Sequence, residues 1–197
     1  MTICGFALGG GVGWAWADAE AYSDDGEPTG RDVEKLGVAE GALVICGAGW
    51  RTIVAEIAVT AYQLKSGAAT ANLAKLMSLA SGLSRSKRAC FERSGIPWSA
   101  DTRFGAILID EGGRLRGLTM HEAEDFVPRR CDAWSLPGVG RVPTCAADVE
   151  AIARDQIGIV RREIPRATGR ALTVAKIGPR GVATAKMLLP DMSSPSR

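Results

Sequence analysis

Thr2 is a candidate catalytic residue because of its position next to the start of the sequence. If Met1 is removed, Thr2 becomes the first residue and carries both a hydroxyl and a free α-amine. The α-amine has an ordinary pKa near neutrality, at about 8, so it can accept the proton of the neighbouring hydroxyl. A small second residue such as threonine permits removal of the initiator methionine. The sequence therefore predicts an N-terminal nucleophile that attacks an amide carbonyl without the help of a histidine.

The remaining reactive side chains predict no metal and no cofactor. The chain has one histidine, His121, which we expect in a turn or at the surface. The cysteines are odd in number, and no two have the C-x-x-C spacing of metal or redox sites: Cys4, Cys46, Cys90, Cys131 and Cys145. We expect them to be reduced and mostly buried.

The composition is that of a globular protein with one core. The chain has 197 residues, of which 46% are hydrophobic and 23% are charged, which predicts one domain over 1–190 and a tail over 191–197. A net charge of +2 argues against a nucleic-acid partner. There is neither an apolar run of about 20 residues nor a signal-peptide pattern, so we expect a cytoplasmic protein without membrane contact.

The element predicted to position Thr2 is a β-hairpin. Residues that favour β-structure fill a first strand over 2–8, and three consecutive glycines then supply the positive φ angles of a tight turn. A second strand over 12–18 ends on the carboxylate of Asp18. Polar and turn-forming residues predict a loop over 19–32.

The rest of the chain is predicted to contain strands, in hairpins, and three helices. Apolar residues at helical spacing predict helices over 50–65, 69–93 and 144–163. Strands are predicted over 33–38, 42–46, 102–109, 114–120, 171–177 and 182–189, with a further one within 124–134. The strand over 42–46 is apolar throughout and should be buried on both faces. Two largely antiparallel sheets that face each other, with helices outside both, would bury all of these apolar surfaces.

This order of elements, with a threonine next to the start, resembles the proteasome β-subunit family. The family includes the bacterial proteasome-like peptidases, and all its members are N-terminal-nucleophile hydrolases. The resemblance implies an α+β fold, a four-layer αββα sandwich. It places the nucleophile at Thr2, an aspartate at Asp18 at the end of the second strand, and a lysine at Lys35 on the third strand. Gly49 matches the glycine that follows the fourth strand and opens the first helix.

The resemblance also implies a role for each of these residues. The ammonium of Lys35 would favour the alkoxide-like state of Thr2 and keep the α-amine neutral, and Asp18 would hold Lys35 in place. The N–H of Gly49 would stabilise the oxyanion. The residues expected to line the substrate pocket are Gly47, Ala48, Arg51 and Ala55. The expected partners are further copies of the chain in a ring, a AAA unfoldase, and a peptide or unfolded-protein substrate.

Two later positions depart from the family pattern and leave alternatives open. Val139 stands where the family carries a serine, and residues 167–170 offer only the hydroxyl of Thr168 where the family has an aspartate and a serine. One alternative is a catalytically inactive structural or assembly protein with the same fold, in which Lys35 and Asp18 form a plain ion pair. The other is an N-terminal-nucleophile amidase that acts on small amides.

Overall fold

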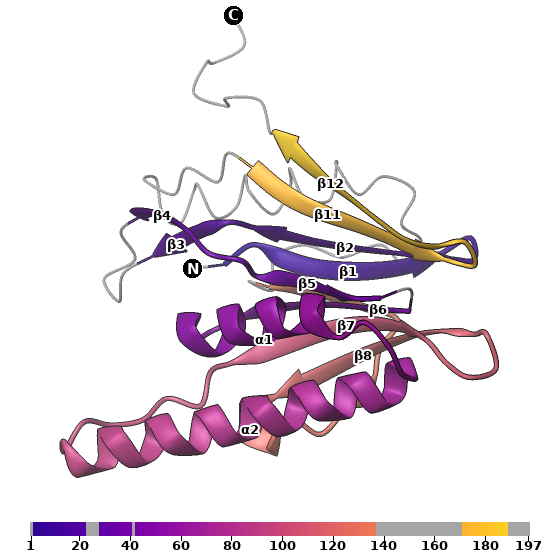
Figure 1. Cartoon of the computed structure of the whole chain (residues 1–197). Coiled ribbons are helices and arrows are strands. Elements are labelled where there is room, and N and C mark those ends of the chain that lie inside the picture. Colours follow the sequence, from indigo (N-terminus) through magenta and orange to yellow (C-terminus); the bar gives the residue numbers. More distant parts are fainter. Residues whose placement is uncertain (1, 23–27, 41, 137–170, 189–197) are drawn as a thin grey trace, which may run out of the picture.

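A computed structural model of the chain describes residues 2–22, 28–40, 42–136 and 171–188 (Figure 1). Its helices and strands are β1 (Cys4–Gly9), β2 (Val12–Asp18), β3 (Glu20–Tyr22), β4 (Pro28–Asp32), β5 (Leu36–Ala39), β6 (Leu43–Ala48), α1 (Arg51–Gln63), α2 (Ala69–Arg93), β7 (Arg103–Ile109), β8 (Leu115–His121), the 3₁₀ turn η1 (Glu122–Glu124), β9 (Arg129–Arg130), β10 (Ala133–Leu136), β11 (Ala171–Gly178) and β12 (Gly181–Leu188).

These strands form two five-stranded sheets and one short ribbon. The first sheet has the order β10-β1-β2-β11-β12 and the second the order β5-β6-β7-β8-β9, while β3 and β4 pair with each other. Every pairing of neighbouring strands is antiparallel. The prediction of largely antiparallel sheets built from hairpins is therefore confirmed over the described residues.

The first hairpin forms where the glycines predict it. β1 and β2 pair from Cys4 with Ala17 to Gly9 with Val12, which leaves a two-residue turn. Gly10 and Gly11 form this turn at φ angles of +57° and +74°. Because such angles are costly for residues with a Cβ, the glycines set both the position of the turn and the register that follows from it.

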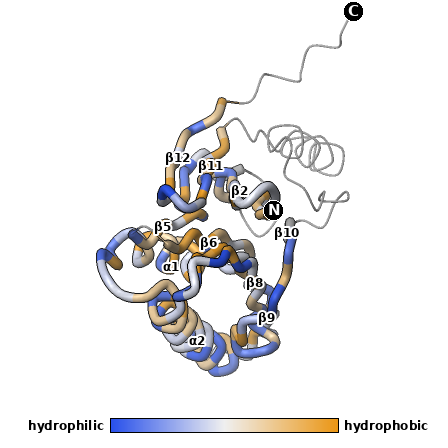
Figure 2. Tube along the Cα trace, turned by 90° about the vertical axis from the view of Figure 1, so that its right-hand side faces the viewer, coloured by the Kyte–Doolittle hydropathy of each residue, from blue (hydrophilic) through white to orange (hydrophobic). Residues whose placement is uncertain are grey.

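The two large sheets pack face to face, and β6 lies at their contact. Alternate side chains of β6 point in opposite directions, so Val44 and Cys46 pack with residues of the first sheet, among them Phe6. Leu43 and Ile45 pack with the helices instead. The prediction that this strand is buried on both faces is confirmed, and Figure 2 shows it as a hydrophobic segment between the helices and the first sheet.

Helices α1 and α2 cover the outer face of the second sheet (Figure 1). Their buried residues include Ile53 and Ile57 of α1 and Leu76 of α2, and full burial of such a side chain stabilises the fold by about 1.5–3 kcal/mol. Helix α1 lies very close to β5 at Gly37, where a Cβ atom would stand 2.5 Å from the carbonyl oxygen of Ala58. The helix predicted over 144–163, which would cover the other sheet, lies outside the described residues.

Three predictions about local structure are wrong. Part of the predicted loop over 19–32 forms the β3–β4 ribbon, supported by a hydrogen bond from the Thr29 hydroxyl to the carbonyl of Ala21. Lys35 precedes β5 instead of lying on it. The single strand expected within 124–134 is two strands, β9 and β10, which belong to different sheets.

Neither α1 nor α2 combines the length and apolarity that crossing a membrane requires.

Candidate functional site

A cavity of about 60 Å³ lies beside Thr2. This volume has room for a few ordered water molecules or a small chemical group. Four of the residues that the sequence predicts for the site meet here, since the lining residues are Thr2, Ala21, Val33, Lys35, Gly49, Arg51 and Val54. Gly47, Ala48 and Ala55, the other predicted pocket residues, are not among them.

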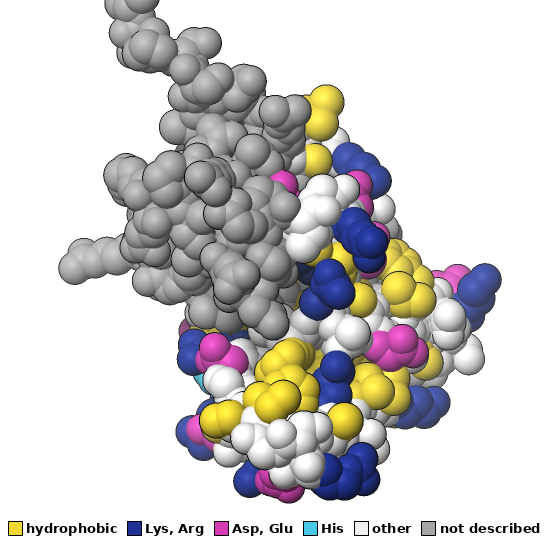
Figure 3. Space-filling view, turned by 90° about the vertical axis from the view of Figure 1, so that its left-hand side faces the viewer, with side chains coloured by type: hydrophobic (Ala, Val, Ile, Leu, Met, Phe, Trp, Pro, Cys, Tyr) yellow, Lys and Arg dark blue, Asp and Glu magenta, His cyan; other side chains and the backbone are white. Residues whose placement is uncertain are grey.

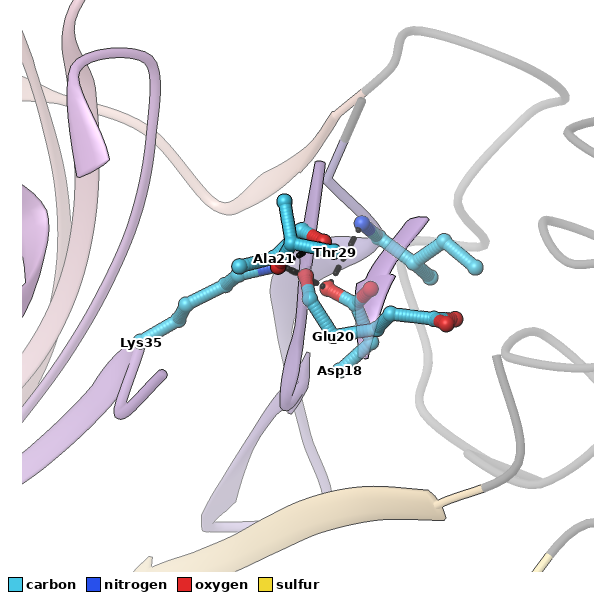
Figure 4. A network of polar contacts seen from close by, with 6 residues as sticks. Asp18, Glu20, Ala21, Thr29 and Lys35 are labelled. Carbon is cyan, nitrogen blue, oxygen red and sulfur yellow. Dashed lines mark hydrogen bonds and ion pairs between the residues drawn. The ribbon is translucent and has the colours of Figure 1, made fainter. Parts of the chain in front are cut away.

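Asp18 and Lys35 form a buried ion pair next to this cavity. The Lys35 ammonium lies 2.9 Å from Oδ1 of Asp18, and it also donates a hydrogen bond to the carbonyl oxygen of Glu20. Figure 4 shows the lysine side chain extended toward these two oxygens, which come from the end of β2 and the start of β3. The ammonium is therefore fixed in direction by two acceptors on neighbouring segments.

The carboxylate of Asp18 is also tied to the strand that carries Thr2. Its Oδ1 accepts a hydrogen bond of 3.1 Å from the backbone N–H of Ile3. The N–H of Asp18 in turn donates to the carbonyl of Ile3 over 2.8 Å. These contacts fix the backbone one residue after Thr2 relative to Lys35, so a single carboxylate sets the positions of both.

The charges of this pair are almost completely removed from solvent. The side chain of Asp18 is fully buried and that of Lys35 is 6% exposed. Burial raises the pKa of Asp18, and the nearby Lys35 ammonium acts in the opposite direction because it favours the carboxylate. A buried pair of this kind contributes little net stability, whereas the loss of one partner is expensive, so its main effect is to position the ammonium.

Gly49 occupies a turn that strongly favours glycine. It joins β6 to α1 with a φ angle of +113°. A Cβ atom at this position would lie 2.5 Å from the Cα of Thr102. The turn brings the start of α1 to the cavity, and the unpaired N–H groups and dipole at a helix N-terminus favour negative charge.

The other predicted pocket residues have structural surroundings that the sequence could not reveal. A Cβ atom at Gly47 would lie 2.6 Å from the ring of Phe104, so the missing side chain accommodates this aromatic ring. Ala48 packs in the core between the sheets. The cavity instead has an apolar wall of Ala21, Val33 and Val54, which sequence reasoning missed. Ala21 lies on β3, in a segment expected to be a loop, and Val33 lies before the start of β5.

Several features of the family pattern lie outside the described residues. Met1, Val139 and Thr168 belong to this group. Within the described part of the chain, no group of three or more His, Cys, Asp or Glu side chains could hold a metal ion.

Comparison with known proteins places the fold. No protein-family profile matches the chain, and no curated protein matches it. Among solved structures, it is similar to a Gly-1 mutant of Anbu from Hyphomicrobium sp. strain MC1, with a TM-score of 0.65 and 12% sequence identity. The match covers 98% of this chain and 89% of that chain. The protein therefore has an α+β, sandwich-like fold similar to that of Anbu.

Proposed function

We propose that this protein is a proteasome-like threonine peptidase that cleaves peptide bonds with Thr2 after removal of Met1. The observation that carries the proposal is the shared cavity of Thr2, Lys35 and Gly49, beside which Asp18 holds the Lys35 ammonium at 2.9 Å. A nucleophile, a cation and a backbone donor beside one space are the parts that acyl transfer needs.

The reaction would proceed through an ester on Thr2. The Oγ1 atom attacks the carbonyl carbon, and the α-amine of the same residue accepts the hydroxyl proton, directly or through a water. When the tetrahedral intermediate collapses, the C–N bond breaks and the proton passes to the departing amine. Water then attacks the ester with the α-amine again as base, which releases the acid and restores the hydroxyl.

Lys35 would act through its charge. A positive charge beside Oγ1 favours the alkoxide-like state and disfavours protonation of the α-amine, which must be neutral to act as a base. Because Asp18 and the carbonyl of Glu20 both accept from the ammonium, its position does not depend on substrate. Asp18 is thus a positioning residue for Lys35.

Gly49 would supply the oxyanion donor. Its N–H lies in the turn that opens α1, where the helix dipole adds to the stabilisation of negative charge. Loss of such a donor commonly raises the barrier by about 3 kcal/mol.

The cavity suggests which substrate side chain would be accepted beside the nucleophile. Ala21, Val33 and Val54 form an apolar wall, and the exposed Arg51 is the additional cation in the lining. A small apolar side chain fits this space. A homo-oligomeric ring and a AAA unfoldase that delivers unfolded protein complete the proposal and rest on the sequence resemblance.

The test is the chemical state and reactivity of the N-terminus. Intact mass should lack Met1, and incubation with a peptide vinyl sulfone should add one inhibitor mass to Thr2. Thr2→Ala should abolish cleavage of peptides and of unfolded protein, whereas Thr2→Ser, the matched control, should retain both. Retention of Met1 without labelling would instead favour the structural role, and hydrolysis of small amides without cleavage of unfolded protein would favour the amidase.

A further inference from the structure

Thr102, a fully buried residue, packs against the turn that contains Gly49. The hydroxyl of Thr102 accepts a hydrogen bond of 3.3 Å from the backbone N–H of Trp50. The Cα of the same threonine blocks the space beside Gly49. Thr102 therefore contacts the Gly49–Trp50 turn with both its side chain and its backbone.

Thr102 is in turn fixed by Glu122, the first residue of η1, directly after β8. The N–H of Thr102 donates to Oε2 of Glu122 over 3.0 Å, and its carbonyl accepts from the backbone N–H of Glu122 over 2.9 Å. The other carboxylate oxygen, Oε1, accepts from the hydroxyl of Ser84 and from the indole N–H of Trp98. A buried carboxylate with three donors is held rigidly, because each bond to a charged group is strong and directional.

A second connection runs from Glu122 to the turn through aromatic rings. Trp98, which donates to Glu122, stacks on Trp50 with ring centroids 4.6 Å apart and planes 7° apart. The indole N–H of Trp50 donates to the carbonyl of Ser99 over 3.0 Å. This cluster lies at the C-terminal end of α2, where Phe91 packs edge-on against both tryptophans. Figure 3 looks at this end of the molecule, where hydrophobic side chains gather among basic ones in the lower half.

We propose that Thr102 and Glu122 are positioning residues that orient the Gly49 N–H for oxyanion stabilisation. This inference rests on the proposed function and adds to it the residues that preorganise the donor. The N–H of Trp50 is bonded to Thr102, so the peptide plane that follows Gly49 is fixed, while β6–β7 pairing fixes Ala48 opposite Arg103 on the other side. Gly49, the most permissive residue type, is thus restrained at both flanks. Oxyanion donors are effective only when their direction is set before reaction.

Two electrophiles separate this role from a general structural one. A β-lactone reacts when Oγ1 of Thr2 adds to its carbonyl, which places negative charge on the carbonyl oxygen before the ring C–O bond breaks; the hydroxyl proton ends on the released alkoxide. A peptide vinyl sulfone reacts when the same Oγ1 adds to the β-carbon, and the proton ends on the carbon next to the sulfone. The lactone develops its negative charge on the carbonyl oxygen, where the Gly49 N–H would act, whereas the vinyl sulfone develops it at the carbon next to the sulfone; both need Thr2 and its base.

The variants are Thr102→Val, which removes the hydroxyl at nearly constant shape, and Thr102→Ser, which restores it. We expect Thr102→Val to slow acylation by the lactone about tenfold, a fraction of the loss seen when an oxyanion donor is removed. Alkylation by the vinyl sulfone should change less than about twofold, and Thr102→Ser should return the lactone rate to that of the parent. Thr119→Val, at another buried threonine of the second sheet, is the matched control and should leave both rates unchanged.

The ratio of the two rate constants is measured on the same folded molecules, so a loss of folded protein does not imitate the effect. If Thr102→Val does not fold, Glu122→Gln and Thr102→Cys provide the same ratio. If Thr102→Val leaves the ratio of the two rate constants unchanged, the positioning role is overturned, while the proposed peptidase function stands. Absence of any Thr2 adduct in the unmodified protein would overturn the proposed function, and the positioning role with it.

Discussion

Two aspartates of this molecule lie at the same distance from a cation, and yet their surroundings shift their pKa values in opposite directions. Asp18 lies 2.9 Å from Lys35, and Asp110, in the β7–β8 turn, lies 2.9 Å from Arg116. Burial raises the pKa of Asp18. Hydrogen bonds from the backbone N–H of Arg114 and from the Arg116 side chain lower the pKa of Asp110, which keeps contact with water.

The difference shows that solvent, and not the closeness of the partner, separates the two pairs. Asp110 also accepts from the N–H of Gly112, so its carboxylate organises a tight turn whose backbone donors need a partner. Asp18 loses hydration that Lys35 and Ile3 only partly replace. The Asp18–Lys35 pair therefore keeps a carboxylate in a place where burial disfavours its charge.

The largest effect should follow from loss of one buried charge. Lys35→Met should destabilise the protein by about 3–5 kcal/mol at neutral pH, because it leaves the Asp18 carboxylate buried without its cation. The destabilisation should shrink as the pH falls, since Asp18 can then take up a proton. Urea unfolding at several pH values measures this directly.

Arg116→Met is the matched control for that experiment. Its partner Asp110 can rehydrate, and the two backbone bonds in the turn remain. We expect a loss of stability several-fold smaller than that of Lys35→Met. Equal losses for the two variants would show that burial does not distinguish the pairs.

A smaller effect is expected for the coupling within each pair. In a double-mutant cycle, Asp18→Asn and Lys35→Met together should cost less than the sum of the single changes, with a coupling of about 2–3 kcal/mol. The double variant leaves no unpaired buried charge, which explains the recovery. The same cycle for Asp110→Asn and Arg116→Met should give a coupling close to that of exposed pairs, and similar couplings in both cycles would contradict the comparison.

The smallest effect lies in the titration itself. Carboxyl-carbon NMR between about pH 2 and pH 8 should place the midpoint of Asp18 above, and that of Asp110 below, the ordinary aspartate value of about 3.9. Folding then depends on pH in opposite ways. The contribution of Asp18 is present below its unfolded pKa and is lost as the pH rises through its folded pKa. That of Asp110 is present above its unfolded pKa and is lost as the pH falls through its folded pKa. Asp18→Asn and Asp110→Asn assign the two signals.

The sequence predicts those elements whose pattern is local. Helix α2 runs from Ala69 to Arg93 without interruption at Gly82, as its apolar spacing predicts. Near this glycine, the hydroxyls of Ser81 and Ser84 donate to the carboxylates of Asp125 and Glu122. The β1–β2 hairpin follows from its glycines. The β3–β4 ribbon was missed because its stability depends on pairing between short polar segments, which no local pattern reports.

The site was predictable only in part for the same reason. The sequence places Thr2, Lys35 and Gly49 in the order of a known family, and the structure brings them to one cavity. No pattern in the sequence indicates a role for Glu122, whose partners Ser84, Trp98 and Thr102 come from three other segments. Buried polar contacts of this type depend on tertiary packing and leave no periodic trace.

The close approach of Gly37 to helix α1 has a consequence for what the protein can accommodate. Ala58 rests on Gly37, and Val54, one turn earlier on the same side of the helix, forms part of the cavity wall. The glycine thus determines the distance between α1 and the sheet, and hence the width of the opening beside Thr2. A methyl group at Gly37 would push α1, and with it the cavity wall at Val54, away from the sheet. It would thereby change which molecules fit the cavity, although Gly37 itself does not line it.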